Sequence, residues 1–133
     1  MDNTNKQPLL ATAALVIEDN KILLLKRGKE PYKNQWGFPG GIGGFKKTLD
    51  PSKSIIEEIR GDVGCEFNGK FFIYNYSKDN ETLTLFFIGS ITGNPKPVCK
   101  NVLEAKFFKF EEVRKMNLAF DHNIVLEKYL EQK

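Results

Sequence analysis

Glu58 and Asp62 are the pair of residues in this sequence whose types and spacing are best suited to chemistry. Residues four apart on a helix project from the same face, so both carboxylates would point in one direction. Two acids on a shared face repel each other by roughly a few tenths of a kcal/mol unless a cation lies between them. The face is either simply solvated or it holds a hard divalent cation such as Mg²⁺, which binds carboxylate oxygens and leaves positions for water and phosphate.

A glycine-rich segment, WGFPGG, lies just upstream of these acids, from Trp36 to Gly41. Gly40 and Gly41 lack Cβ atoms, so their backbone can approach a ligand closely. Together with the acidic helix, this turn could place carbonyl oxygens beside the carboxylates around a metal-bound pyrophosphate. Without the helix, the same glycines would be compatible with an ordinary turn between a strand and a helix.

These residues resemble the Nudix hydrolase family, whose box reads G-x5-E-x7-R-E-U-x-E-E-x-G-U after a W-x-(F/L)-P-G stretch, where U is a bulky aliphatic residue. The segment 36–41 matches the preface, and four residues fall in register with the second half of the box: Glu58, Ile59, Val63 and Gly64. The flanking segments 27–36 and 104–122 resemble ADP-ribose pyrophosphatase-like members. The resemblance therefore extends over roughly residues 11 to 130.

The resemblance implies an α/β fold, a Nudix-type α/β/α sandwich with a mixed sheet between helices. It also implies a pyrophosphohydrolase in which metal-activated water attacks the diphosphate of a nucleoside diphosphate linked to another group, with ADP-ribose-like substrates favoured. The implied cofactor is Mg²⁺, for which Mn²⁺ can substitute. Glu58 would be the catalytic residue, the metal site would include Gly40, Glu57, Glu58, Asp62 and Glu104, and the substrate would contact Arg27, Phe38 and Gly41.

The sequence also departs from the box at the helix itself. Gly61 replaces the first of the paired glutamates, so one expected metal ligand is missing, and Asp62 is a shorter acid than the second. Glu57 stands where the family has arginine, and the stretch from Gly41 to Gly64 is two residues longer than the consensus. These departures favour an alternative, a Nudix-fold module that binds a nucleotide but is catalytically impaired.

Glu57 has two alternative uses. Its side chain could lean over the bare Gly61 and partly replace the missing carboxylate. Alternatively, it could form the structural ion pair of the family with the charges exchanged, because Lys47 lies six residues after Gly41. Counting backward from the helix places Leu49 at that position instead, so the register stays open.

Three further residues have both a functional and a structural interpretation. Glu104 could be another metal ligand or base from a later loop, or a solvated acid at the start of a strand. Phe38 could help to hold a base, although a core role is typical in a chain with eleven phenylalanines. His122 has an ordinary pKa near ~6.5 and could titrate usefully, but it follows a helix cap and is expected to serve the structure.

The elements that must position these residues can be read from the hydrophobic pattern. Alternation and β-branched or aromatic residues predict strands, and a tight turn at Asp19-Asn20 joins the first two. Asp50 followed by Pro51 predicts the start of a helix, and Gly64 predicts its end. The predicted strands are 10–17, 21–26, 71–76, 82–91 and 104–110, with a loop over 28–44, a short helix over 111–116 and a terminal helix over 121–131.

Composition predicts a single globular domain over residues 1–133, with residues 1–8 as a flexible N-terminal tail. A net charge of +3 is compatible with an anionic nucleotide substrate but too weak for a duplex nucleic-acid groove. Two distant cysteines and one histidine argue against zinc and favour a reducing, cytoplasmic location. No apolar run is long enough to span a membrane. Nudix proteins are often dimers, so the resemblance is compatible with a homodimer, but no stretch of the sequence indicates an interface.

Overall fold

The structure, a computed structural model, describes residues 7–132 and is built around one mixed β-sheet. The main path of the sheet runs β3-β2-β1-β6-β5, while β4 pairs with β1 and β7 pairs with β2. The β1–β6 pair is parallel and the other pairs are antiparallel, as predicted for a mixed sheet. The strands are β1 (Leu9–Glu18), β2 (Lys21–Arg27), β3 (Trp36–Gly37), β4 (Gly40–Gly41), β5 (Glu66–Ser77), β6 (Thr82–Thr92) and β7 (Val102–Lys109).

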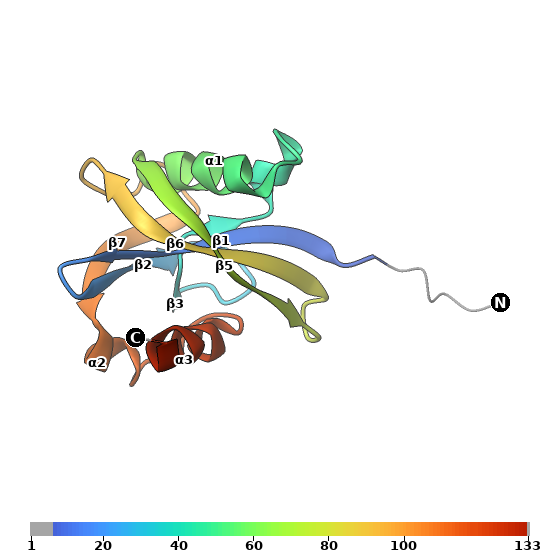
Figure 1. The fold of residues 1–133 in the computed structure, drawn as a ribbon. Coiled ribbons are helices and arrows are strands. Elements are labelled where there is room, and N and C mark those ends of the chain that lie inside the picture. Colours follow the sequence, from blue (N-terminus) through green and yellow to red (C-terminus); the bar gives the residue numbers. More distant parts are fainter. Residues whose placement is uncertain (1–6, 133) are drawn as a thin grey trace.

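Helices cover both faces of the sheet (Figure 1), which confirms the predicted α/β/α layering. Helix α1 (Pro51–Val63) lies on one face, and α2 (Phe110–Val113) and α3 (His122–Gln132) lie on the other. Alternate residues of β1 enter the two cores, because successive side chains of a strand point to opposite faces. Ala14 and Val16 pack in the α1 core, whereas Ala13 and Leu15 pack in the α3 core.

Helix α1 begins and ends where its sequence predicts. The Asp50 carboxylate accepts a hydrogen bond from the Ser52 backbone N–H at 3.0 Å, and Pro51 occupies the first turn. Gly64 adopts a left-handed conformation with φ 71°, which glycine tolerates at a helix end. Ile55, Ile59 and Val63 form the buried face of the helix. This burial fixes the rotation of α1 and thereby the direction in which its carboxylates point.

The remaining boundaries differ from the sequence predictions by a few residues. Strand β5 begins at Glu66 instead of Phe71, because its first residues, polar apart from the buried Phe67, pair with β6 through the backbone. The predicted loop 28–44 contains the two short strands β3 and β4 and the first half of a 3₁₀ turn, η1 (Gly43–Lys46). Strand β7 begins two residues earlier than predicted, and the helix α2 is shorter than predicted.

The ends of the chain are described only in part. Of the predicted tail 1–8, residues 1–6 lie outside the described residues, and Gln7 and Pro8 are exposed and have no regular structure. The hairpin between β1 and β2 forms as predicted, with positive φ values of 52° and 62° at Asp19 and Asn20. Within residues 7–132, none of the helices combines the length and the hydrophobicity needed to cross a membrane.

Candidate functional site

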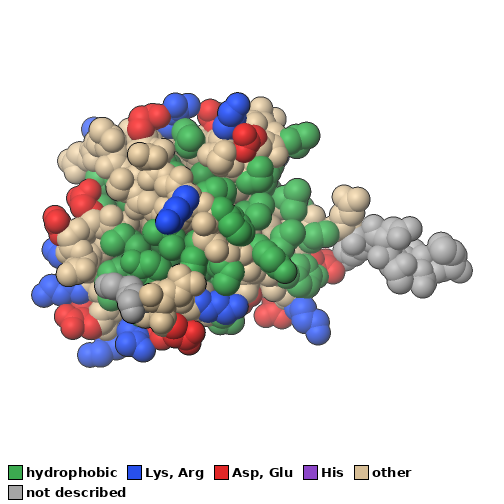
Figure 2. Space-filling view, viewed as in Figure 1, with side chains coloured by type: hydrophobic (Ala, Val, Ile, Leu, Met, Phe, Trp, Pro, Cys, Tyr) green, Lys and Arg blue, Asp and Glu red, His purple; other side chains and the backbone are tan. Residues whose placement is uncertain are grey.

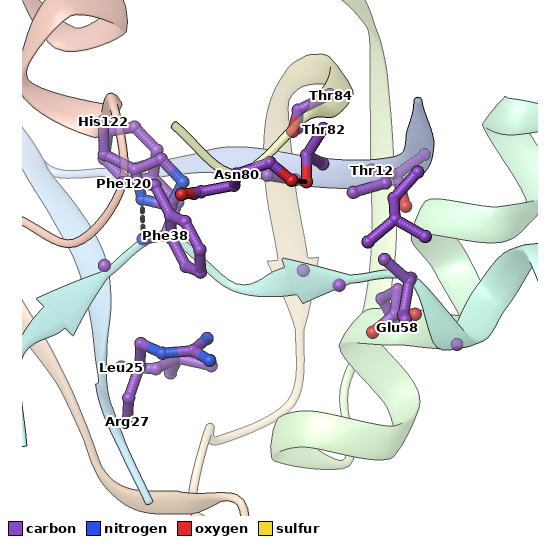
Figure 3. A pocket seen from close by; sticks show the side chains of 18 of the residues that line it. Thr12, Leu25, Arg27, Phe38, Glu58, Asn80, Thr82, Thr84, Phe120 and His122 are labelled. Carbon is purple, nitrogen blue, oxygen red and sulfur yellow. Dashed lines mark hydrogen bonds between the residues drawn. The ribbon is translucent and has the colours of Figure 1, made fainter. Parts of the chain in front are cut away.

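A cavity of about 700 Å³ lies where the loop 37–43, the helix α1 and the strands β1, β5 and β6 meet. Its lining includes Glu58 and Asp62 from α1, together with Gly40 and Gly41. Figure 3 shows Glu58 at one end of the view, and His122 and Phe120 at the other. The two carboxylates and the glycine-rich loop singled out by the sequence therefore share one cavity.

The Glu58 carboxylate is held by the backbone of the loop that precedes the helix. The Gly44 N–H donates a hydrogen bond to Glu58 Oε2. Gly41 passes so close that a Cβ atom there would lie 2.9 Å from Glu58 Oε1. Burial raises the pKa of Glu58, while the Gly44 N–H and the charges of Lys29 and Lys47 act in the opposite direction. The carboxylate is thus fixed in position but only weakly compensated.

Asp62 lies deeper in the same wall of the cavity. Its Oδ2 accepts a hydrogen bond from the Gly40 N–H at 3.2 Å. Burial and the neighbouring negative charge of Glu58 raise the pKa of Asp62 to about 7. A carboxyl with this pKa is only about half ionised near pH 7, and a bound cation would favour its ionised form.

Gly40 is required by the backbone path at this point. It has a φ of 150°, and a Cβ atom there would lie 2.2 Å from the carbonyl oxygen of Thr12. The close approach arises because β4 pairs with β1 at Thr12 and Ala13. The sequence-based hypothesis gave Gly40 a metal-binding carbonyl; the contact that the structure describes is the bond from its N–H to Asp62.

Cationic side chains also line the cavity that holds the two acids. Arg27, Lys29 and Lys46 all contribute to the lining. The Arg27 guanidinium stacks over the Phe120 ring at 4.8 Å, and its Nε donates to the carbonyl oxygen of Pro31 at 2.7 Å. Arg27, predicted to contact substrate, is therefore held rigidly at the cavity wall. Cations beside two carboxylates can bind an anionic group such as a diphosphate.

At the end of the cavity away from Glu58, Phe38 and His122 contact each other through a hydrogen bond and through their stacked rings. The Phe38 N–H donates to His122 Nδ1 at 3.0 Å, and the two rings stack with centroids 4.6 Å apart. Burial lowers the pKa of His122 to about 3, so the ring is neutral and carries its proton on Nε2. Phe38 is 5% exposed and belongs to the α3 core while its edge lines the cavity.

Glu57 and Glu104, the two other predicted metal ligands, are placed away from the cavity lining. Glu57 contacts Lys47 at 3.4 Å and Arg60 at 3.2 Å. The structure thus forms the charge-exchanged pair with Lys47, and the rival position, Leu49, is 86% exposed. Glu104 is 55% exposed at its side chain and lies 3.7 Å from Lys26. The structure does not bring either acid to Glu58 and Asp62, and their role as metal ligands stays a prediction.

The residues at the cavity fit a divalent cation that is bound by two carboxylates, not by three. Among residues 7–132, no group of three or more Asp, Glu, His or Cys side chains could hold a metal ion. Two carboxylates, Glu58 and Asp62, remain, and Mg²⁺ is commonly bound by one or two carboxylates with water and substrate phosphates completing the shell. A Cβ atom at Gly61 would meet nothing within 4 Å, so the missing third carboxylate is not replaced by another side chain there.

Sequence reasoning missed several groups at the cavity. The Gly44 N–H that holds Glu58 comes from the two-residue excess of the loop, where the box pattern gives no guidance. Lys29 reaches the cavity from the segment 27–36, where the resemblance does not single it out, and Lys46 reaches it from the longer loop that the box pattern does not cover. Asn80 lies in the turn between β5 and β6, and only the three-dimensional path of that hairpin brings it to the lining.

The arrangement of this sheet, glycine loop and acidic helix matches a known family. The family model of the NUDIX domain matches residues 8–129, nearly the whole chain. The chain belongs to the Nudix family. Among curated proteins, this Nudix chain is 28% identical over 131 residues to an ADP-ribose pyrophosphatase of Methanocaldococcus jannaschii, covering 95% of this chain and 75% of that protein.

Solved structures resemble the Nudix chain in fold. A NUDIX hydrolase from Nitrosomonas europaea superposes with a TM-score of 0.84 at 18% identity, covering 96% of this chain and 73% of that chain. The NUDIX domain of Shewanella oneidensis NrtR, crystallised in complex with ADP ribose, superposes with a TM-score of 0.79 at 20% identity, covering 97% and 90%. At these identities the superpositions establish the fold, and the activity must be argued from the site.

Proposed function

We propose that this Nudix chain is a metal-dependent pyrophosphohydrolase that cleaves the diphosphate of a nucleoside diphosphate linked to another group. The observation that carries the proposal is the pairing of Glu58 and Asp62 in one cavity, facing the glycine loop. Among the described residues, neither carboxylate forms an ion pair with a lysine or arginine within 4.0 Å. Acids left unpaired in a lined cavity are suited to binding a cation and not to stabilising the fold.

Different residues of the cavity would bind the cation, orient the attacking water and bind the diphosphate. Glu58 and Asp62 would hold Mg²⁺ or Mn²⁺, which when bound lowers the pKa of water and offsets charge on the bridging oxygens. Glu58, fixed by the Gly44 N–H, would also orient the attacking water. Arg27 and Lys29, which line the same cavity, would bind the diphosphate oxygens. These roles would place the water, the phosphorus and the leaving oxygen in one cavity.

An ADP-ribose-like substrate is favoured by two comparisons. The curated relative at 28% identity is called an ADP-ribose pyrophosphatase, and the Nudix domain of NrtR was crystallised with ADP ribose. The cavity, at about 700 Å³, is also within the range of roughly 300–1,000 Å³ that is typical of small-molecule pockets.

A second candidate is a Nudix-fold module that binds the same nucleotide and turns it over slowly or not at all. Its support is Gly61, which leaves two carboxylates where the box pattern has three, and the lack of a third metal-binding side chain among residues 7–132. Each tenfold loss of rate corresponds to about 1.4 kcal/mol of barrier. The loss of one ligand can therefore convert an enzyme into a binding protein without a change of fold.

A substrate panel with a rescue variant separates the two candidates. The purified protein is incubated with nucleoside diphosphate sugars, dinucleotides and nucleoside triphosphates in Mg²⁺ and in Mn²⁺, and release of nucleoside monophosphate or phosphate is followed. Gly61→Glu is assayed beside it, because the space around Gly61 accommodates a side chain. Gly61→Ala is the matched control, since it changes helix propensity without adding a carboxylate.

The pyrophosphohydrolase is supported if the wild type cleaves a nucleoside diphosphate derivative only when the divalent cation is present. The binding module is supported if the wild type is silent and Gly61→Glu turns the substrate over. It is equally supported if both are silent while calorimetry detects bound nucleotide. Turnover that persists in excess EDTA would contradict the proposed metal dependence.

A further inference from the structure

One part of the cavity lies far along the chain from the acids and has a different character. Asn75 and Ser77 of β5 lie opposite Thr84 and Thr82 of β6 in the antiparallel register. All four line the cavity, on the face of the sheet that carries the α3 core. Beyond the last apolar pair of that face, Ile73 with Phe86, the sheet therefore presents a polar, uncharged floor. We refer to these four residues as the polar floor.

Asn80, in the turn that joins β5 to β6, has a buried side-chain donor that no protein group among the described residues satisfies. This donor is the side-chain Nδ2. A buried amide donor without a partner costs roughly 1–3 kcal/mol. Asn80 lines the cavity, and Figure 3 shows its side chain beside Thr82 and Thr84, on the side of the cavity opposite Leu25 and Arg27. A ligand that reaches the polar floor could accept this hydrogen bond.

The charges around the polar floor favour an uncharged ligand group over a phosphate. The lysines and the arginine of the cavity lining come from β2, the loop that follows it and η1, whereas β5, β6 and their turn contribute none to it. The nearest charge that faces the floor is the Asp121 carboxylate, whose Oδ2 accepts from Asn75 Nδ2 at 3.0 Å. A phosphate group would be repelled there. An uncharged group with several hydroxyls can donate to a carboxylate or a threonine oxygen and accept from an amide.

We infer that the polar floor and Asn80 form the subsite for the uncharged, hydroxyl-bearing group joined to the nucleoside diphosphate, with Asn80 Nδ2 donating to one of its oxygens. This rests on the proposed function, and it names the part of the substrate that the cavity distinguishes. Hydroxyls satisfy both the donors and the acceptors of the floor, whereas a terminal phosphate of a triphosphate satisfies only donors. The subsite thus favours a diphosphate capped by a sugar over a nucleoside triphosphate.

The test compares ADP-ribose with ADP, which shares the adenosine diphosphate but has a free terminal phosphate in place of the inferred group. Affinities are measured by calorimetry with Ca²⁺ in place of Mg²⁺, and chromatography verifies that the ligand is intact afterwards. Asn80→Ala is expected to weaken ADP-ribose binding about tenfold, the effect of one hydrogen bond in a desolvated site, and to leave ADP binding unchanged. Its melting temperature is expected to equal or exceed that of the wild type, because the amide donor has no protein partner.

Asn123→Ala is the matched control, an asparagine whose amide is fully used by the fold. Asn123 accepts from the Leu118 N–H at 2.8 Å and donates to the Met116 carbonyl at 2.9 Å. This variant should lower the melting temperature and leave the ratio of ADP-ribose to ADP affinity unchanged. An equal loss for both ligands in Asn80→Ala would overturn the inference, because the adenosine half would then contact Asn80. Unchanged binding of both ligands would overturn it as well.

The inference and the proposed reaction can fail separately. A wild type that binds ADP-ribose without cleaving it contradicts the proposed hydrolysis, and a selective loss in Asn80→Ala would still support the subsite. A wild type that cleaves ADP-ribose while Asn80→Ala cleaves it with an unchanged KM overturns the subsite alone. If the wild type binds neither ligand, both the subsite and the proposed substrate class are overturned.

Discussion

The two sides of helix α1 carry the same kind of side chain in opposite surroundings. Glu58 and Asp62 point into the cavity, and burial raises the pKa of both. Glu57, on the other side of the helix, contacts Lys47 and Arg60, and the Arg60 guanidinium continues to Glu66 at 2.6 Å and 2.7 Å. The outer acids are neutralised by the protein itself, whereas the inner acids are compensated by two backbone N–H groups.

This difference separates structural acids from functional ones within three turns of helix. Exposed ion pairs contribute about 0–1 kcal/mol each, so the outer network can be changed at little cost. The inner pair raises the free energy of the folded state by keeping two carboxyls close together and away from water, and such an arrangement persists where a ligand requires it. The residue type alone, glutamate or aspartate, does not distinguish the two sides.

The largest expected effect is on turnover and comes from Glu58→Gln. This change keeps the size of the side chain and the acceptor for the Gly44 N–H, but it removes the charge. We expect kcat/KM for the best substrate of the panel to fall at least ~10³-fold, about 4 kcal/mol of barrier. Steady-state kinetics in Mg²⁺ measures it. A fall of less than tenfold would show that the inner side of α1 is not the catalytic side.

Asp62→Asn tests the inner side through stability. The folded-state pKa of Asp62 is raised to about 7, so the folded protein binds its proton more tightly than the unfolded chain does. The stability of the metal-free protein should therefore fall as the pH rises from about 4 to about 7, and Asp62→Asn should remove that fall. Relative to wild type, the variant gains up to ~4 kcal/mol at pH 8. Urea unfolding in EDTA across this pH range measures it.

Added Mg²⁺ provides the control for that experiment. In the wild type at pH 8, Mg²⁺ should raise the urea midpoint, since the cation binds only the folded state. Asp62→Asn should lose most of this increase. An equal response of both proteins to Mg²⁺ would place the cation elsewhere.

Gly61→Ala tests a position of helix α1 that belongs to neither the inner nor the outer group of acids. Gly61 is exposed, and a Cβ atom there meets nothing within 4 Å, so only helix propensity changes. The free energy of unfolding should rise by about 1 kcal/mol, and kcat should stay within twofold of the wild type. Thermal unfolding and the same kinetic assay measure the two quantities. A loss of activity would indicate that the glycine backbone itself contacts the substrate.

The smallest effect is expected on the outer side, from Glu57→Gln. Its contacts with Lys47 and Arg60 predict a loss of less than ~1 kcal/mol in stability and little change in kcat. The alternative use of Glu57, as a substitute metal ligand, predicts a loss of turnover as large as that of Glu58→Gln. Kinetic assays of both variants side by side therefore decide between the two uses.

Much of the fold could be predicted because local rules and tertiary packing agree. The cap at Asp50, the glycine at 64 and the apolar spacing of Ile55 and Ile59 each specify the same helix, and the structure confirms its bounds. Strand β5 was predicted too short, since backbone pairing with β6 extends it through residues 66–70, where Phe67 is the one apolar side chain. Pairing partners of that kind lie too far away in the sequence for a local pattern to reveal them.

The candidate site was predictable only where a motif names its residues. Glu58, Asp62 and Gly40 line one cavity, because the helix places the two acids on one face and the pairing of β4 with β1 places Gly40 beside them. Their roles at a metal stay a prediction. The Lys47–Glu57 contact could not be settled from the sequence, because the longer loop leaves two registers open, and the η1 turn selects one. Asn80 and Asp121 are 41 residues apart in the sequence and line the same cavity only when the sheet and α3 are assembled.

The bond between the Phe38 N–H and His122 has a practical consequence for handling the protein. The Ala119 N–H also donates to the Trp36 carbonyl at 2.8 Å, so the loop that forms one wall of the cavity is fastened to the segment leading into the terminal helix. Trimming that helix, or attaching an affinity tag to it, would disturb a surface more than eighty positions earlier in the chain. In the view of Figure 2, charged side chains lie around the edge of the molecule and hydrophobic side chains gather near its centre. Purification handles belong at the amino end, where Gln7 and Pro8 are exposed.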